Sequence, residues 1–202
     1  MIIISIIISI SIFFSDVQKN DQVIRYVIWS NNYKLLNSDF QNPDKPELKK
    51  RVWNFSEEAI LRTGIVSIIK QTDFSIEVFV IPIVDREKSW KMDTLNCDGI
   101  HHEQLHFNIT ELYARKLRKE LKQLIDNDVL DINPYENLVD SLKNELENQQ
   151  FMYDYETITG HVKEKQGEWF TKIEEQLNEY AEFSTDSIDI PNEIITTLQK
   201  RK

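Results

Sequence analysis

Three residues near the middle of the chain, His102, Glu103 and His106, spell the sequence H-E-x-x-H. Residues four apart on a helix lie one turn above each other on the same face, so two imidazoles at this spacing can converge on one metal ion. Glu103, next to the first histidine, can reach a water at an open zinc position and take its proton. The spacing therefore predicts a zinc site in which His102 and His106 bind Zn²⁺ and Glu103 is the general base.

Paired histidines at helical spacing also occur on ordinary solvent-facing helices, so the surroundings of the motif decide between the two interpretations. Three of the four histidines of the chain lie in the segment HHEQLH. The helix predicted to carry them has a strong apolar face and follows a predicted sheet, and these observations favour the metal site. His101 points about 100° round the helix from His102, so we expect it on the surface.

A catalytic zinc site needs a third protein ligand. The extended motif H-E-x-x-H-x-x-G-x-x-H requires glycine and histidine at positions that hold Ile109 and Leu112, which excludes that subclass. Two candidates lie in the segment YDYETITGHVKEKQGEW. His161 would complete a three-histidine set, and Glu156 would complete an equally good His-His-Glu set. The suitability of imidazole for zinc favours His161.

The part of the chain before the motif has the pattern of an antiparallel sheet. Residues 22–30 are β-branched and aromatic, as strands are. Residues 59–70 and 73–84 predict a β-hairpin, because apolar and polar residues mostly alternate from Phe74 onward and give the second strand one buried face. Pro82 is then expected near a strand end or at a sheet edge.

From about Asn96 the apolar residues recur at steps of three, four or five, which predicts a helix packed on a core. Asn133 and Pro134 mark the start of a second helix, and Gly160 separates it from a third that carries Trp169. Because strands come first and helices follow, the sequence predicts an α+β fold. An N-terminal antiparallel β-sheet precedes a helical half that carries H-E-x-x-H.

Length and composition limit the classes of function. A chain of 202 residues suggests one domain. Its formal charge of −10 would repel a phosphate backbone, so nucleic acid is not an expected partner. The one cysteine, Cys97, excludes an internal disulfide and a thiolate zinc site.

The N-terminal run MIIISIIISISIFF is apolar except for serine and too short to span a bilayer comfortably. It predicts a signal peptide over residues 1–15, and the alternative is a buried N-terminal β-strand. We therefore expect a single metallohydrolase domain over residues 16–202, with no stable membrane span once the leader is removed.

Two other groups of residues admit a functional interpretation. The basic run ARKLRKELK, residues 114–122, could bind an anion, but its interleaved leucines and nearby glutamates favour a solvated helix face. A hydroxyl from Tyr153 or Tyr155 could donate a hydrogen bond to an oxyanion. Packing in the core or at its rim is the better interpretation of both tyrosines.

At these residues the chain resembles a known family. The runs SWKMDTLNCDGIHHEQLHFNITELYARKLRKEL and YDYETITGHVKEKQGEW are similar to the bacterial domain of unknown function 922, described as secreted zinc-dependent proteases. Its members typically show a His-Glu-Gln-x-His-Phe-Asp-Ile-like block, an Ala-Arg-x-Leu segment, and a Tyr-Asp-x-Glu-Thr-x-His-Gly block with downstream Gln and Trp. Upstream, KLLNSDFQNP is similar to the family's Leu-x-Trp-x-Asp-Phe-x-Gly segment, with Asn37 in place of Trp and Asn42 in place of Gly. The resemblance spans most of the chain after the leader.

One position departs from this family. In the register set by Glu156, Gly160 and Trp169, the family's histidine falls at Thr159, and His161 lies two residues later. The resemblance implies a secreted or periplasmic bacterial protein with a zincin-like fold. It implies a zinc-dependent hydrolase, a peptidase that acts on peptide or protein substrates.

The displaced histidine also makes a second class of protein credible, a zinc-stabilised binding or scaffold protein that has kept the fold without turnover. The two classes differ at the metal. A fourth protein ligand would close the site and favour the scaffold, whereas an open position beside Glu103 would favour the enzyme.

Overall fold

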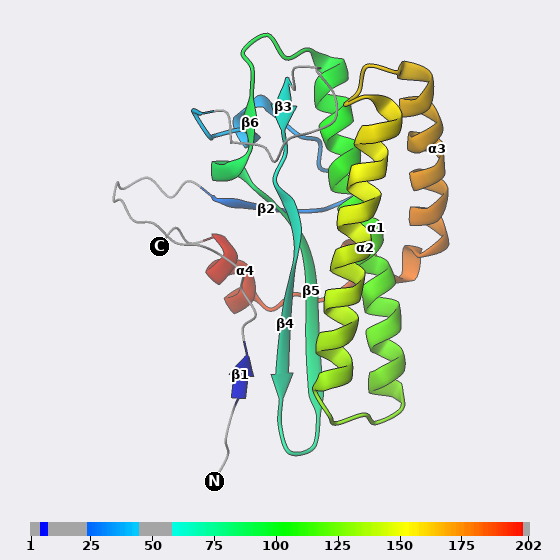
Figure 1. Cartoon of the computed structure of the whole chain (residues 1–202). Coiled ribbons are helices and arrows are strands. Elements are labelled where there is room, and N and C mark those ends of the chain that lie inside the picture. Colours follow the sequence, from blue (N-terminus) through cyan, green and yellow to red (C-terminus); the bar gives the residue numbers. More distant parts are fainter. Residues whose placement is uncertain (1–4, 8–23, 45–57, 200–202) are drawn as a thin grey trace.

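The computed structural model describes residues 5–7, 24–44 and 58–199, which form an antiparallel sheet followed by a helical half (Figure 1). This arrangement confirms the predicted α+β class. The main sheet has the strand order β1-β4-β5-β2, and every neighbouring pair is antiparallel. Its strands are β1 (Ser5–Ile7), β2 (Tyr26–Ile28), β4 (Thr63–Gln71) and β5 (Ile76–Asp85), while β3 (Ala59–Ile60) and β6 (Trp90–Lys91) pair with each other.

The predicted hairpin is confirmed, with a longer turn than expected. Strands β4 and β5 pair continuously from Thr63 opposite Val84 to Gln71 opposite Ile76. Residues 72–75 make the turn, in which the Thr72 backbone N–H donates to the Ser75 carbonyl at 2.9 Å. Phe74, expected on the buried face, lies in this turn and is 90% exposed. Burial alternates along β4, whereas every residue of β5 from Val80 to Asp85 is buried, so the prediction of one buried face is wrong for this half of β5.

Pro82 lies inside β5, which is an inner strand of the sheet, and the expectation of a strand end or sheet edge holds only in part. The Pro82 carbonyl accepts a hydrogen bond from the Trp29 N–H at 3.2 Å, one residue beyond the end of β2. In an antiparallel strand the N–H and C=O of one residue point to the same neighbour. The missing N–H of Pro82 therefore faces Trp29, so the second hydrogen bond of this residue pair cannot form, and the ladder between β2 and β5 ends here.

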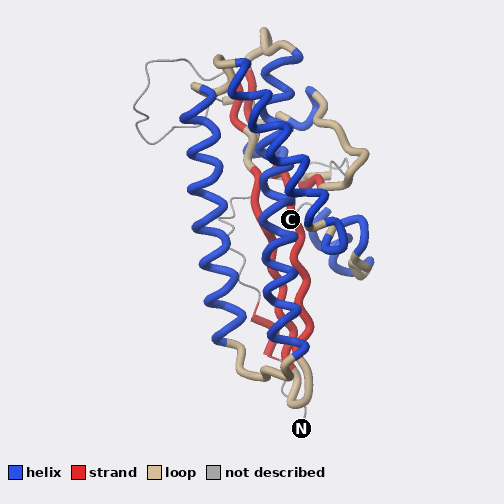
Figure 2. Tube along the Cα trace, turned by 90° about the vertical axis from the view of Figure 1, so that its right-hand side faces the viewer, coloured by secondary structure: helices blue, strands red, loops and turns tan. Residues whose placement is uncertain are grey.

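The three predicted helices are confirmed. The side chain of Asn96 caps the first by accepting from the Gly99 N–H at 3.0 Å, and Pro134 lies in the first turn of the second. Figure 2 shows the strands running alongside a helix over much of their length. The helices are α1 (Cys97–Asp126), α2 (Asn133–Thr157), α3 (Lys163–Glu179) and a short α4 (Asn192–Gln199).

Helix α1 is the centre of the core. Its apolar face packs against β4 and β5 on one side and against α2 and α3 on the other. The fully buried members of this cluster include Ile109, Ala114 and Leu117 of α1, Tyr135 and Tyr153 of α2, and Ile173 of α3.

The basic run of α1 is solvated at Lys122 and half-buried at Lys116 and Lys119, but the predicted solvated face is wrong for its two arginines. Arg115 and Arg118 are 5% and 9% exposed, and the buried carboxylate of Glu111 lies between them. Arg118 donates to the carbonyl of Val80 in β5, and Arg115 donates to the hydroxyl of Ser184 beyond α3. These guanidinium groups are buried because they bind carbonyl, hydroxyl and carboxylate oxygens that the core would otherwise leave without donors.

The turns and helix ends gather at two opposite ends of the fold. The β4–β5 turn and the α1–α2 turn lie together at one end (Figures 1 and 2), where the Gln71 side chain donates to the Leu130 carbonyl at 2.8 Å. At the other end the first turns of α1 meet the last turns of the antiparallel helix α2 and the start of α3. The H-E-x-x-H motif lies at this second end.

Of the N-terminal apolar run, residues 5–7 form β1, and the rest of the predicted signal peptide lies outside the described residues. Among the described helices, none combines the length and the apolar character needed to cross a membrane.

Candidate metal centre

His102 and His106, one turn apart on α1, meet Asp154 of α2. The Nε2 atoms of the two histidines are 3.2 Å apart, and Asp154 Oδ1 lies 3.2 Å from His102 Nε2 and 2.9 Å from His106 Nε2. The two helices are antiparallel, so the end of α2 lies beside the start of α1. Nitrogen and carboxylate oxygen are both zinc ligands. The three side chains form a group that could hold a metal ion.

The third member of this group differs from the predicted one. Asp154 occupies the place expected for His161, which lines the same cavity but is not part of the group. Glu156, the other predicted candidate, accepts a hydrogen bond from the Trp169 indole at 2.8 Å. Within the described part of the chain, no other set of three histidine, cysteine, aspartate or glutamate side chains is close enough to hold a metal.

A signal for Asp154 was present in the sequence. The apolar stripe of α2 runs through Leu138, Leu142 and Leu146 at four-residue steps, and the same steps continue to Gln150 and Asp154. Polar residues on the core-facing stripe of a helix need buried partners. The choice between His161 and Glu156 considered ligand chemistry alone and missed this periodicity.

The electrostatics of the group favour a cation at its centre. Burial alone would lower the pKa of His106, but the charge of Asp154, a hydrogen bond to it and the charge of Glu103 raise this pKa to about 9. Burial alone would raise the pKa of Asp154, yet the two histidines hold it far below its usual range. Burial lowers the pKa of His102 to about 4. A proton therefore lies between His106 and Asp154 when no metal is bound, at a position suited to a cation.

The ring of Tyr153 packs against both imidazoles. Its ring stacks on His102, with centroids 4.6 Å apart and an interplanar angle of 22°, and meets His106 edge-on at 4.8 Å. Tyr153 has no exposed surface, and its hydroxyl donates to the His102 carbonyl at 3.4 Å. These contacts agree with the packing interpretation of this residue. Tyr155 is 44% exposed on the outer face of α2.

Glu103 is held beside the group by the segment before β4. Its Oε2 accepts a hydrogen bond from the Leu61 N–H at 3.0 Å, and the residue is 5% exposed. It is close enough to His106 for its charge to raise the pKa of that imidazole. The backbone contact orients the carboxylate of the residue predicted as general base.

A tight turn after α2 brings Gly160 against His102. Residues 158–160 all have positive φ, with Ile158 at 49°, Thr159 at 51° and Gly160 at 87°. A Cβ at position 160 would lie 3.1 Å from Cγ of His102, a tight contact that the imidazole could relieve only by shifting. This close approach explains the glycine and covers the outer edge of the His102 ring.

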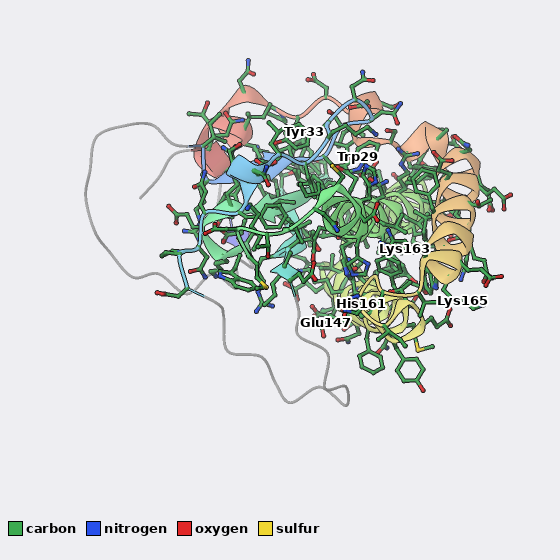
Figure 3. The ribbon with its side chains drawn as sticks, turned by 90° about the horizontal axis from the view of Figure 1, so that it is seen from above. Trp29, Tyr33, Glu147, His161, Lys163 and Lys165 are labelled. Carbon is green, nitrogen blue, oxygen red and sulfur yellow. The ribbon has the colours of Figure 1, made fainter. Side chains whose placement is uncertain are left out.

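The site opens into a cavity of about 1070 Å³. Its wall contains Glu103 and the three members of the group, together with residues 58–66 and the turn that carries His161. Figure 3, seen from above, places His161 and Glu147 on one side of α1 and Trp29 and Tyr33 on the other. His101 is exposed, as predicted, and lines a smaller cavity on the Trp29 side.

Comparison of the chain with protein-family models, with curated proteins and with solved structures finds no match. The resemblance to the family described above therefore stays a prediction from the sequence.

Proposed function

We propose that the protein is a zinc-dependent hydrolase that cleaves peptide bonds, with His102, His106 and Asp154 as zinc ligands and Glu103 as general base. The convergence of the two motif histidines on one carboxylate, in the wall of a large cavity that also contains Glu103, is the observation that supports this proposal. Two imidazoles and a carboxylate form a set of three protein ligands, as catalytic zinc sites require.

The chemistry divides between the ion and the protein. Zinc, when bound, acts as a Lewis acid that lowers the pKa of water to near 7 and polarises a carbonyl. Glu103 takes the proton of the attacking water and passes it to the leaving amine. The hydrogen bond from the Leu61 N–H keeps the carboxylate oriented for both transfers. Tyr153, stacked on His102, keeps solvent from the inner side of the site.

The cavity supports an extended peptide as the substrate. Four consecutive residues of β4, 63–66, line it. Successive side chains of a strand point to opposite faces, so a run of four lining residues means that the cavity meets the strand along its edge. Within the described residues, β1 pairs only with residues 69–71 of β4. An extended chain could therefore add to the sheet beside residues 63–66 through backbone hydrogen bonds.

A fourth protein ligand would favour the scaffold alternative. Within the described residues the group has three members, and it borders the cavity. This arrangement favours the enzyme, because a position on the ion would then be open to water and substrate. The apolar run over residues 1–14 supports a secreted or periplasmic location for such a peptidase if it is a signal peptide and not the strand to which β1 belongs.

Metal analysis and a peptide-cleavage screen test the proposal together. The purified protein should take up one zinc ion and cleave a subset of a broad peptide library. The variant Glu103→Gln should keep the zinc and lose turnover by ~10²- to 10⁴-fold, the range usual for general acid–base groups. Glu120→Gln, at the far end of the same helix, is the matched control and should cleave like the parent.

Two results would contradict the proposal. If no zinc is taken up at neutral pH, the metal site does not exist. If zinc is bound and Glu103→Gln cleaves peptides as fast as the parent, Glu103 is not the base.

A further inference from the structure

The side-chain amide of Gln150 forms hydrogen bonds with two parts of His106, the imidazole and the backbone carbonyl. Gln150 precedes Asp154 by one turn of α2, and its Oε1 lies in hydrogen-bond contact with His106 Nδ1. Its Nε2 donates to the His106 carbonyl at 2.9 Å and to Thr110 Oγ1 at 3.1 Å. One amide therefore contacts both the ring and the backbone of the same motif histidine.

The donors and acceptors around this amide fix its orientation. The His106 carbonyl can only accept, and Thr110 already donates its hydroxyl proton to that carbonyl at 3.0 Å. The Thr110 oxygen is then an acceptor for Gln150. Both contacts require the NH₂ group of the amide, so the atom that faces His106 Nδ1 is the amide oxygen.

This orientation determines which nitrogen of His106 can bind a metal. An amide oxygen accepts and cannot donate, so His106 Nδ1 must carry a proton. His106 Nε2 is then the nitrogen whose lone pair can serve a metal, and it is the atom that lies 2.9 Å from Asp154 and 3.2 Å from His102 Nε2. The nitrogen selected by Gln150 thus faces the centre of the group.

We propose that Gln150 is a positioning residue, which holds His106 in the tautomer and ring orientation that bind the metal through Nε2. This role rests on the zinc site proposed above. Gln150 need not touch the ion or the substrate, because it acts through His106. A hydrogen bond to the outer nitrogen fixes the ring and increases the basicity of the ligating nitrogen.

Substitutions at Gln150 separate the acceptor from the rest of the side chain. Gln150→Met keeps the length and fills the same space without an acceptor for Nδ1, so zinc affinity should fall by ~10- to 100-fold, as is usual when such a partner is lost. Gln150→Glu keeps an acceptor for Nδ1 and should retain most of the zinc affinity of the parent. Zinc affinity is measured by competition with a chelator at neutral pH.

Gln149→Met is the matched control. Gln149 is the neighbouring glutamine, and its amide oxygen accepts from the Tyr113 hydroxyl at 3.4 Å, away from the group. Zinc affinity of this variant should equal that of the parent. A loss at Gln149 as large as that at Gln150 would mean that α2 tolerates no such change and would overturn the specific role.

Nitrogen-15 NMR of the zinc-loaded parent tests the tautomer directly, whether or not Gln150→Met folds. The His106 signals should show zinc on Nε2 and a proton on Nδ1 that exchanges slowly with water. In Gln150→Met this proton should exchange faster.

The outcomes distinguish this role from the metal site itself. Zinc on Nδ1 of His106 in the parent, or unchanged affinity in Gln150→Met, would overturn the role of Gln150 and leave the zinc site intact. A parent that binds no zinc would refute the site and, with it, this role.

Discussion

At the scale of single residues, the charge of Asp154 is what distinguishes the site from two neighbouring histidines on a helix. Asp154→Ala removes one of the three groups that converge, so we expect a loss of zinc affinity beyond the ~100-fold upper range for residues that only orient a ligand. His161→Ala and Glu156→Ala are the comparison, because both were predicted from sequence as the third ligand. Chelator competition on the three variants ranks them.

The order of the three effects decides the assignment. If His161→Ala strips the zinc while Asp154→Ala leaves its affinity unchanged, the ligand set is the three-histidine set first predicted. If Glu156→Ala has the largest effect, the set is His-His-Glu, and the Trp169 contact of Glu156 is broken when metal binds.

The metal-free protein should lose stability as pH rises above neutral. The pKa of His106 is raised from 6.5 to about 9 by Asp154 and Glu103, against the opposing effect of burial. The proton is bound more tightly in the folded state, so its contribution is full below pH 6.5 and disappears as pH rises through 9. At about 1.4 kcal/mol per pKa unit the loss is on the order of 3 kcal/mol. Urea unfolding of the metal-free protein between pH 6 and 9.5 measures it.

Asp154→Asn is the control for this pH dependence. It removes the negative charge that holds the His106 proton, and its unfolding free energy should change much less between pH 6.5 and 9. Equal pH dependence in the parent and in Asp154→Asn would show that another group causes the loss.

At the scale of the elements, the turn after α2 makes the site possible because it closes against His102 without a side chain at position 160. Gly160→Ala should lower the free energy of unfolding by more than ~1 kcal/mol, since alanine disfavours φ of 87° and its Cβ would lie 3.1 Å from the imidazole. Zinc affinity should fall as well, because the ring that has to move is a ligand. Chemical unfolding and chelator competition measure the two effects.

Gly167→Ala is the matched control for that substitution. Gly167 lies in α3, and a Cβ there would meet nothing within 4 Å. Alanine in an exposed helix position should raise the free energy of unfolding by ~0.5–1 kcal/mol and leave zinc affinity unchanged. A Gly160→Ala variant as stable as Gly167→Ala would contradict the close approach of the turn.

The elements themselves were predictable where a long periodic pattern decides the structure. The helices around Leu117, Leu142 and Ile173 and the β4–β5 hairpin follow from steps of four and of two residues. Phe74 and Pro82 were less predictable. The length of the turn shifted Phe74 out of the strand, and the place where β2 ends made an inner position acceptable for Pro82.

Of the candidate metal site, the motif residues were predictable from the sequence and the third member was not. His102, Glu103 and His106 are local, since one turn of one helix places them together. The third member depends on how α2 packs beside α1, a property of the whole fold that residue chemistry alone does not contain. Only the continuation of the leucine stripe of α2 to Asp154 carries this information.

At the scale of the whole molecule, α1 serves two separate sets of contacts. Its first turns carry the metal group, and its middle carries the buried cluster of Glu111, Arg115 and Arg118. The sequence predicted a solvated face for this basic run. That prediction missed the burial of the two arginines, because their partners come next to α1 only in the folded chain. The partners lie in β5 and in the 3₁₀ helix η4 (Thr185–Ser187), both far away in the sequence.

The final prediction concerns this cluster, which ties α1 to the sheet and to the segment after α3. Glu111 accepts from Arg115 at 2.7 Å and from the Thr185 backbone and hydroxyl at 2.9 and 2.6 Å. Glu111→Ala leaves two buried guanidinium groups without their carboxylate, which should cost ~3–5 kcal/mol. Lys122→Ala, which breaks the exposed pair with Asp126 on the same helix, should cost at most ~0.5 kcal/mol.

Urea unfolding of the two variants, both in the metal-free form, compares these costs directly. Because a domain is stable by only ~5–15 kcal/mol, the expected loss in Glu111→Ala is a large fraction of the total. The residual folded protein should still bind zinc, since the cluster lies beyond the motif along α1 and shares no side chain with it. Glu111→Ala that unfolds at the same urea concentration as Lys122→Ala would mean that the buried arginines find other acceptors, and that packing alone holds α1 to the sheet.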